Sequence, residues 1–180
     1  SEVASFSGYY TEEIRNFENI YTGNGADIVI GTNGANRIYT NGGNDFISAL
    51  GGNDTIYAGA GNDHVIGGSG ADFMDGGTGV DTVDARPWSG GGTYNLSTEV
   101  ASFAGFYTEE IRNFENIYTG SGVDNITGTS GNNRIESGAG DDIINAGSGN
   151  DYILGGTGND TIVGGLGNDT INGTTHGSQG

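Results

Sequence analysis

The chain has 180 residues, with 38 Gly, one Pro and no Cys, and its formal net charge is −18. So many glycines argue against a conventional globular core. The negative charge argues against binding to nucleic acid or to an anionic membrane surface and favours cations. The lack of Cys excludes disulfides and thiolate metal sites, and no apolar run approaches the roughly 20 residues of a membrane span.

A long duplication organises the chain. Residues 2–38 recur at residues 99–135 with 28 of 37 positions identical, and this offset of 97 holds without insertion as far as Gly173. The protein is therefore one 97-residue unit followed by a second copy that lacks its end. Because it starts without Met and begins part-way through the pattern, we expect it to be a piece of a longer protein, with residues 1–21 as a partial capping segment.

Within each copy a nine-residue period takes over. Seven consecutive nonapeptides span residues 22–84 and six span residues 119–172. Position four is Gly in all thirteen, position eight is always Val, Ile or Met, and position six is Asp in eleven and Asn in two. Eleven of the 14 Asp share one phase of the repeat, which a bias in composition cannot produce.

Each position of the repeat has a physical role. Glycines at positions one, two and four permit positive φ and suit a tight turn, whereas positions seven to nine form a short strand whose middle side chain points inward. A strand with one inward residue cannot bury a core alone, so the repeats must stack as a solenoid of two parallel sheets. One coil then takes two nonapeptides and rises by about 4.8 Å.

Stacking predicts rows of carboxylates along both edges of the coils. Like charges at one coil's separation require a cation between them, and a site of oxygen ligands without His or Cys suits calcium rather than zinc, copper or magnesium. Backbone carbonyls of the turns would supply the remaining oxygens. The predicted ligands are Asp27, Asp45, Asp63 and Asp81 on one edge, Asp54 and Asp72 on the other, and Asp124, Asp142, Asp160, Asp151 and Asp169 in the second copy.

The nonapeptides resemble a known family. GGSGADFMD, GGTGVDTVD, GGTGNDTIV and GGLGNDTIN are similar to the repeats-in-toxin (RTX) motif G-G-x-G-x-D-x-U-x. The resemblance covers 117 of the 180 residues. It implies an all-β fold, a right-handed parallel β-roll (β-solenoid) that binds calcium, and a secreted bacterial protein, related to toxins or adhesins, that leaves the cell by type I secretion and folds in calcium-rich medium.

Some repeats depart from the pattern. GTNGANRIY and GTSGNNRIE carry Thr at position two and Asn36 or Asn133 at position six, so we expect weaker or vacant calcium sites there. Glu18 and Glu115 fall in the sixth phase of a degenerate preceding unit and are either further ligands or exposed strand-edge charges. One ion per adjacent pair gives up to nine calcium ions, two of which depend on Asn.

Residues 85–118 interrupt the repeats. We expect them to form a connecting or capping segment between roll block 1 (22–84) and roll block 2 (119–172). This segment holds the only Trp and several aromatic residues. It is interpreted as a strand-rich cap over the open end of a roll, the alternative being an aromatic surface for a ligand. Residues 173–180 form a polar tail.

These features favour a calcium-binding structural module over an enzyme. Neither H-E-x-x-H nor G-x-S-x-G occurs, so any catalysis would reside outside this chain. The alternatives are an auxiliary domain of a secreted protease, lipase or polysaccharide-modifying enzyme, or an adhesin segment that binds an extracellular protein or glycan. We expect a monomer whose partners are calcium ions, which unfolds largely when calcium is removed.

Overall fold

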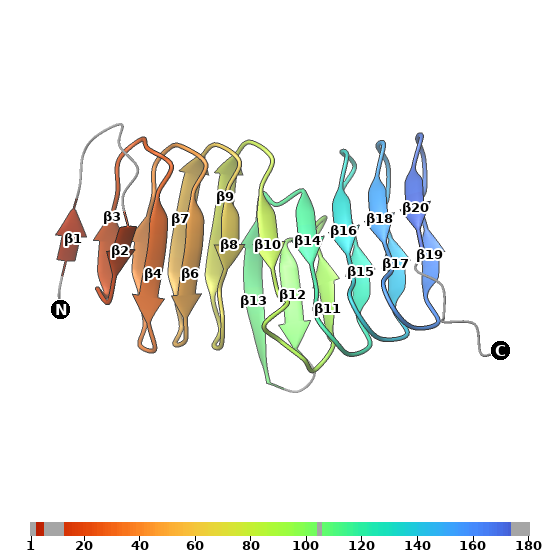
Figure 1. Ribbon diagram of the computed structural model, residues 1–180, viewed down its shortest axis with the longest axis horizontal. Helices are drawn as coiled ribbons and strands as arrows, with labels where there is room; N and C mark the ends of the chain where they lie inside the picture. The colour runs from red at the N-terminus through yellow and green to blue at the C-terminus, as the bar shows by residue number, and fades with distance from the viewer. Residues whose placement is uncertain (1–2, 6–12, 104–105, 174–180) are drawn as a thin grey trace. The chain divides into compact units, whose positions relative to one another are not determined.

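The computed structural model describes residues 3–5, 13–103 and 106–173 (Figure 1). The chain divides into two compact units: unit 1 comprises Ser1–Asp84 and Tyr107–Phe114, and unit 2 comprises Ala85–Phe106 and Glu115–Gly180. The interrupting residues 85–118 are therefore shared between the units. In the described ranges every regular element is a strand, and there is no helix long and apolar enough to span a membrane.

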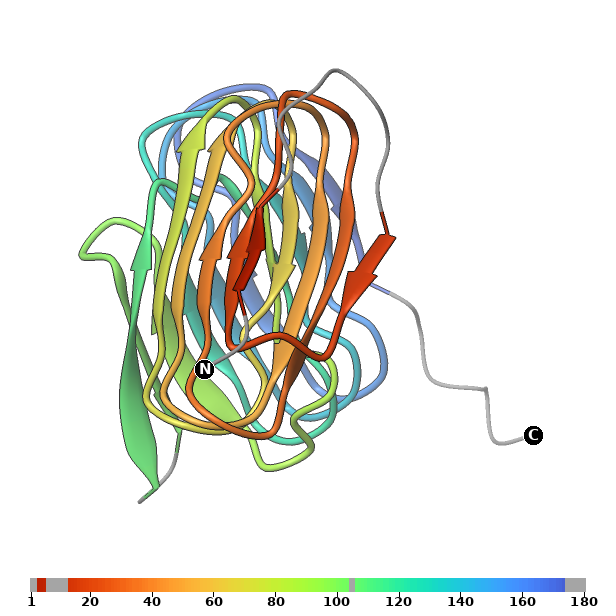
Figure 2. The same ribbon diagram turned by 90° about the vertical axis from the view of Figure 1, so that its left-hand side faces the viewer.

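Unit 1 is a parallel solenoid of two facing sheets. Its first sheet has the order β1 (Val3–Ser5), β3 (Asn19–Tyr21), β5 (Arg37–Tyr39), β7 (Thr55–Ala60), β9 (Phe73–Thr78) and β13 (Tyr107–Arg112). Its second sheet has the order β2 (Glu13–Arg15), β4 (Ile28–Thr32), β6 (Phe46–Leu50), β8 (His64–Ile66) and β10 (Thr82–Asp84). Figure 2, seen from the N-terminal side of unit 1, shows its successive coils behind one another with turns at both edges.

Unit 2 repeats this arrangement and adds a hairpin. One sheet has the order β12 (Val100–Phe103), β11 (Gly92–Asn95), β15 (Asn125–Thr127), β17 (Ile143–Asn145) and β19 (Thr161–Val163). The other has the order β14 (Asn116–Tyr118), β16 (Arg134–Glu136), β18 (Tyr152–Leu154) and β20 (Thr170–Asn172). Strands β11 and β12 are antiparallel, and β11 covers the edge of β15 in parallel register.

The strand register confirms two nonapeptides per coil. Val29 pairs with Ile47 and Ile47 with Val65, each eighteen residues further along. Eleven of the thirteen position-eight side chains are buried between the two sheets of their unit. Ile162 is only partly buried and Ile171 is 50% exposed, because β19 and β20 are the last strands of their sheets. The all-β parallel β-roll predicted from the repeats is thus the observed fold.

The turns explain why glycine recurs at position four. Gly61 has a φ of +138°, and a Cβ built on it would lie 1.6 Å from the carbonyl oxygen of Gly43 in the preceding coil. Only glycine permits so close a backbone approach. Position two takes positive φ in most repeats, and Asn41 and Leu50, which stand in place of glycine in two of them, adopt φ values of 62° and 77°.

Candidate metal centre

The residues at position six lie in the turns immediately before the strands and stack into four rows. We name each row by the strands that follow it. The β4–β10 row contains Asp27, Asp45, Asp63 and Asp81; the β5–β9 row contains Asn36, Asp54 and Asp72; the β15–β19 row contains Asp124, Asp142 and Asp160; and the β16–β20 row contains Asn133, Asp151 and Asp169. The structure thus brings together the residues that the eighteen-residue spacing predicted to be neighbours.

A repeated hydrogen bond connects the members of each row. The backbone N–H of each sixth residue donates to Oδ1 of the sixth residue one coil later, as from Asp27 to Asp45, over 2.8 Å. Seven such bonds join two aspartates. They are Asp27 to Asp45, Asp45 to Asp63, Asp63 to Asp81, Asp54 to Asp72, Asp124 to Asp142, Asp142 to Asp160 and Asp151 to Asp169, with distances of 2.8–3.1 Å.

The second carboxylate oxygen has no such partner in most of these residues. Oδ2 is buried and accepts no hydrogen bond in the described part of the chain in seven residues: Asp45, Asp54, Asp63, Asp72, Asp124, Asp142 and Asp151. A buried, unpaired carboxylate oxygen is costly. One such oxygen would be an isolated defect, but recurrence at the same position of successive coils indicates that these oxygens face a common kind of ligand.

Burial makes these carboxyl groups resist ionisation. It raises the pKa of Asp45 and of Asp63 from the ordinary 3.8 to about 6 and the pKa of Asp54 to about 7, which outweighs the lowering effect of the hydrogen bond from the backbone. Burial also raises the pKa of Asp72, Asp124, Asp142 and Asp151. A cation beside Oδ2 would reverse this effect because it favours the charged form.

The donor set fits calcium. Each pair of adjacent aspartates offers carboxylate oxygens, which are the hard ligands that calcium prefers. Within the described ranges no three acidic, His or Cys side chains converge on one point. Calcium takes roughly six to eight oxygens, so carbonyls or water must complete a site made by two carboxylates.

In the two repeats with Asn at position six, the side chain at this position makes a different set of hydrogen bonds. Asn36 accepts the backbone N–H of Thr32 at Oδ1 (2.9 Å), and its Nδ2 donates to the carbonyl of Phe17 and to Oγ1 of Thr32, each over 3.1 Å. Asn133 makes the same two bonds with Thr129, and its Nδ2 donates to the carbonyl of Glu115, one residue beyond the counterpart of Phe17. The amide oxygen and nitrogen of both Asn side chains are thus hydrogen-bonded within the protein. Thr at position two accompanies Asn at position six because the two residues are hydrogen-bonded to each other.

Glu18 and Glu115 lie one coil before these two asparagines. The backbone carbonyl of Glu18 accepts the N–H of Arg37 over 2.7 Å, and that of Glu115 accepts Nδ2 of Asn133 over 2.6 Å. Both residues are partly buried. Their backbones therefore continue the β5–β9 and β16–β20 rows, and a ligand role for their side chains stays a prediction.

A second ladder at position five was not foreseen. Oδ1 of Asn44 accepts the backbone N–H of Asn62 over 2.8 Å, and Oδ1 of Asn62 accepts that of Val80 over 2.9 Å. Asn132, Asp141 and Asn150 make the same bond in unit 2. From donor to acceptor these exposed bonds run one coil back along the chain, opposite to those at position six, which run one coil forward. The recurrence of Asn before Asp in the repeats was the available signal.

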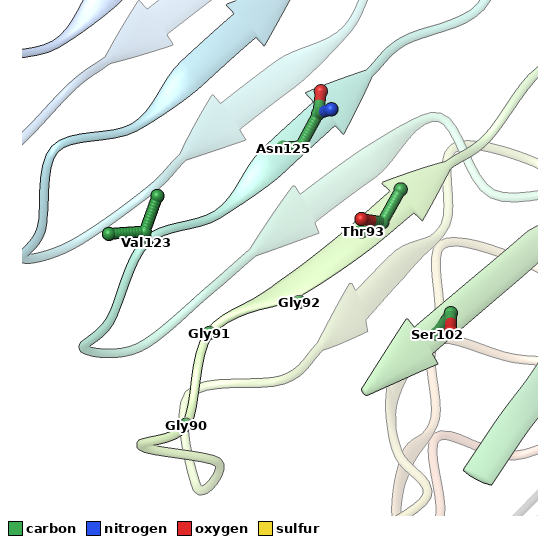
Figure 3. A pocket seen from close by; sticks show the side chains of 7 residues that line it. All are labelled: Gly90, Gly91, Gly92, Thr93, Ser102, Val123 and Asn125. Carbon is green, nitrogen blue, oxygen red and sulfur yellow. The ribbon is translucent and has the colours of Figure 1, made fainter. Parts of the chain in front are cut away.

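A pocket of about 470 Å³ in unit 2 adjoins the β15–β19 row, because Val123 and Asn125 flank Asp124 and the N–H of Gly92 donates to Oδ1 of Asp124 over 2.7 Å. It is lined by Gly90, Gly91, Gly92, Thr93, Ser102, Val123 and Asn125 (Figure 3). Thr93 lies between Asn125 on β15 and Ser102 on β12, as the strand register requires. The lining residues include no acid, base or nucleophile other than two hydroxyl groups, so the pocket lacks a catalytic constellation.

Comparison with known proteins addresses the same repeats. The model of the family described as RTX calcium-binding nonapeptide repeat (4 copies) matches residues 21–56, 48–83, 118–153 and 146–175. These stretches contain all four rows and more than half of the chain. None of the curated proteins compared with the chain matches it.

Proposed function

Because the chain belongs to the RTX calcium-binding nonapeptide repeat family, we propose that its aspartate rows hold calcium ions between successive coils. The protein is then a structural repeat module rather than a catalytic domain. The observation that carries the proposal is the series of buried Oδ2 atoms without a hydrogen-bond partner in the described residues, at the same position of successive coils. Calcium would supply the positive charge that these oxygens lack.

The proposed sites are the seven aspartate pairs that share a backbone hydrogen bond. Three lie in the β4–β10 row, one in the β5–β9 row, two in the β15–β19 row and one in the β16–β20 row. The proposed ligands are Asp27, Asp45, Asp54, Asp63, Asp72, Asp81, Asp124, Asp142, Asp151, Asp160 and Asp169. The pairs of Asn36 with Asp54 and of Asn133 with Asp151 are not among them, since Thr32 and Thr129 occupy the amide oxygens.

Calcium binding would be coupled to folding. Without the ion, each coil must bury carboxylates beside those of the next coil, which opposes stacking. With the ion, the same groups cross-link neighbouring coils and the binding free energy becomes folding free energy. Such a chain would stay largely unfolded where calcium is scarce and fold where it is abundant. This property supports secretion by a bacterium and folding outside the cell.

Adjacent residues of one turn provide a matched test of the ligands. Asp142 is buried and belongs to two proposed sites, whereas Asp141 is exposed and belongs to the position-five ladder, where Asn is the usual residue. Both substitutions, D142N and D141N, remove one negative charge. Isothermal titration calorimetry would count the bound calcium ions and measure their affinity.

We expect D142N to lose up to two ions and D141N to keep the full number, with affinity nearly unchanged. Circular dichroism at saturating calcium would show whether each variant is folded. Equal ion counts in the wild type, D142N and D141N would contradict the assignment of ligands. A wild type that binds no calcium would contradict the proposed function altogether.

A further inference from the structure

Strand β13 takes the place of a repeat although its sequence is not a nonapeptide. It pairs in parallel with β9, with Glu110 opposite Phe73, Ile111 opposite Met74 and Arg112 opposite Asp75. Ile111 is fully buried and thus occupies a position-eight place next to Met74. The N–H of Glu110 donates to the carbonyl of Asp72 over 2.9 Å, the bond that position seven makes to position six in the regular coils.

This register puts Glu109 at position six, directly after Asp72 in the β5–β9 row. Side chains two apart on a strand share a face, so Glu109 lies on the same side as the buried Ile111. Glu110 points outward, where it is about half exposed and forms an ion pair with Arg112. Glu109 itself is only 5% exposed.

Two buried acidic groups therefore meet at the end of this row. Asp72 is 3% exposed, its Oδ1 accepts the N–H of Asp54, and its Oδ2 has no hydrogen-bond partner in the described part of the chain. Two neighbouring buried carboxyl groups are costly without a cation between them.

We propose that Glu109 and Asp72 form a further calcium site, in which the interrupting strand β13 supplies a ligand from outside the nonapeptides. The inference rests on the proposed calcium-binding function. The buried Oδ2 of Asp72 and the buried carboxyl group of Glu109 supply oxygen ligands from adjacent strands, the same relation that joins two aspartates in the regular coils. Calcium would then fasten residues 107–114 to β9 and so complete unit 1.

The test compares two neighbouring glutamates. E109Q keeps the size of the side chain and removes its charge, and E110Q makes the same change at the outward position. Ion counts are measured with calcium alone by calorimetry and by native mass spectrometry, while circular dichroism at saturating calcium follows the fold. We expect E109Q to bind one ion fewer than the wild type and E110Q to bind the same number.

An unchanged ion count in folded E109Q would overturn the proposal, because the carboxylate of Glu109 would then not be needed for any calcium site. That result would leave the proposed function intact, provided that D142N still loses ions. If E109Q does not reach the wild-type spectrum in calcium, a crystal of the wild type grown in calcium decides. An ion between the carboxylates of Glu109 and Asp72 supports the site, and a direct hydrogen bond between them contradicts it.

Discussion

At the scale of single residues, the aspartates of the rows combine two features that oppose each other without a cation. Most of them are buried, and in seven of them Oδ2 accepts no hydrogen bond within the described part of the chain. Position six could be identified from sequence because eleven of 14 aspartates share its phase. That Oδ1 accepts a backbone N–H while Oδ2 does not depends on side-chain torsions, which a repeat pattern does not contain.

These buried carboxyl groups predict an unusual response to pH. The folded pKa of Asp45 and Asp63 is about 6 and that of Asp54 about 7, above the ordinary 3.8, so the calcium-free folded state binds more protons than the unfolded chain. The stability of the calcium-free fold should therefore rise as the pH falls from about 7.5 to about 4.5. Circular dichroism in calcium-depleted buffer should show a growing β-sheet signal over this range.

The same titration at a fixed, near-saturating calcium concentration is the control. Protons then compete with calcium for the carboxylates, so acid should weaken the fold instead of strengthening it. A calcium-free spectrum that does not change between pH 7.5 and 4.5 would mean that burial of the aspartates does not limit folding.

At the scale of one element, the structure of the nonapeptide's turn and strand could be predicted in part from the sequence. The strand triplets and their inward middle residue follow from the period, as Ile47 and Ile56 illustrate. Glu109 could not be assigned to position six from the sequence, because two pairs of residues have the spacing of positions six and eight. One pair is Glu109 and Ile111, and the other is Glu115 and Ile117, six residues later. Six residues do not fit the nine-residue period, so only the pairing of β13 with β9 resolves the phase.

The glycine at position four is the most demanding residue of the regular turn. G61A would force a Cβ to within 1.6 Å of a backbone oxygen at a φ of +138°. We expect it to destabilise the calcium-bound protein by about 3 kcal/mol or more. The loss is measured from the shift of the urea unfolding midpoint at saturating calcium.

Gly34 provides the control, because it is the position-four glycine of the repeat that contains the hydrogen-bonded pair Thr32 and Asn36. The nearest atom to its added Cβ would be Oγ1 of Thr32 at 3.7 Å, an ordinary contact. G34A should change stability by no more than about 0.5 kcal/mol. Similar losses in both variants would show that position-four glycine acts through something other than backbone approach.

At the scale of the molecule, the two units repeat one plan. Both stack eighteen-residue coils, both bury position eight between parallel sheets, and in both the second nonapeptide carries Asn at position six. The period and the duplication predicted this plan. The assignment of residues 107–114 to unit 1 and of residues 85–106 to unit 2 was not predictable, because it depends on strand pairing between segments distant in sequence.

The central claim is that calcium between stacked turns holds the coils together. It is tested most directly by circular dichroism of the calcium-depleted protein at neutral pH, titrated with calcium and then with excess chelator. We predict a largely unfolded spectrum that converts cooperatively to a β-sheet spectrum as calcium binds and reverts when the chelator removes it. A complete β-sheet spectrum that persists in excess chelator would contradict the claim.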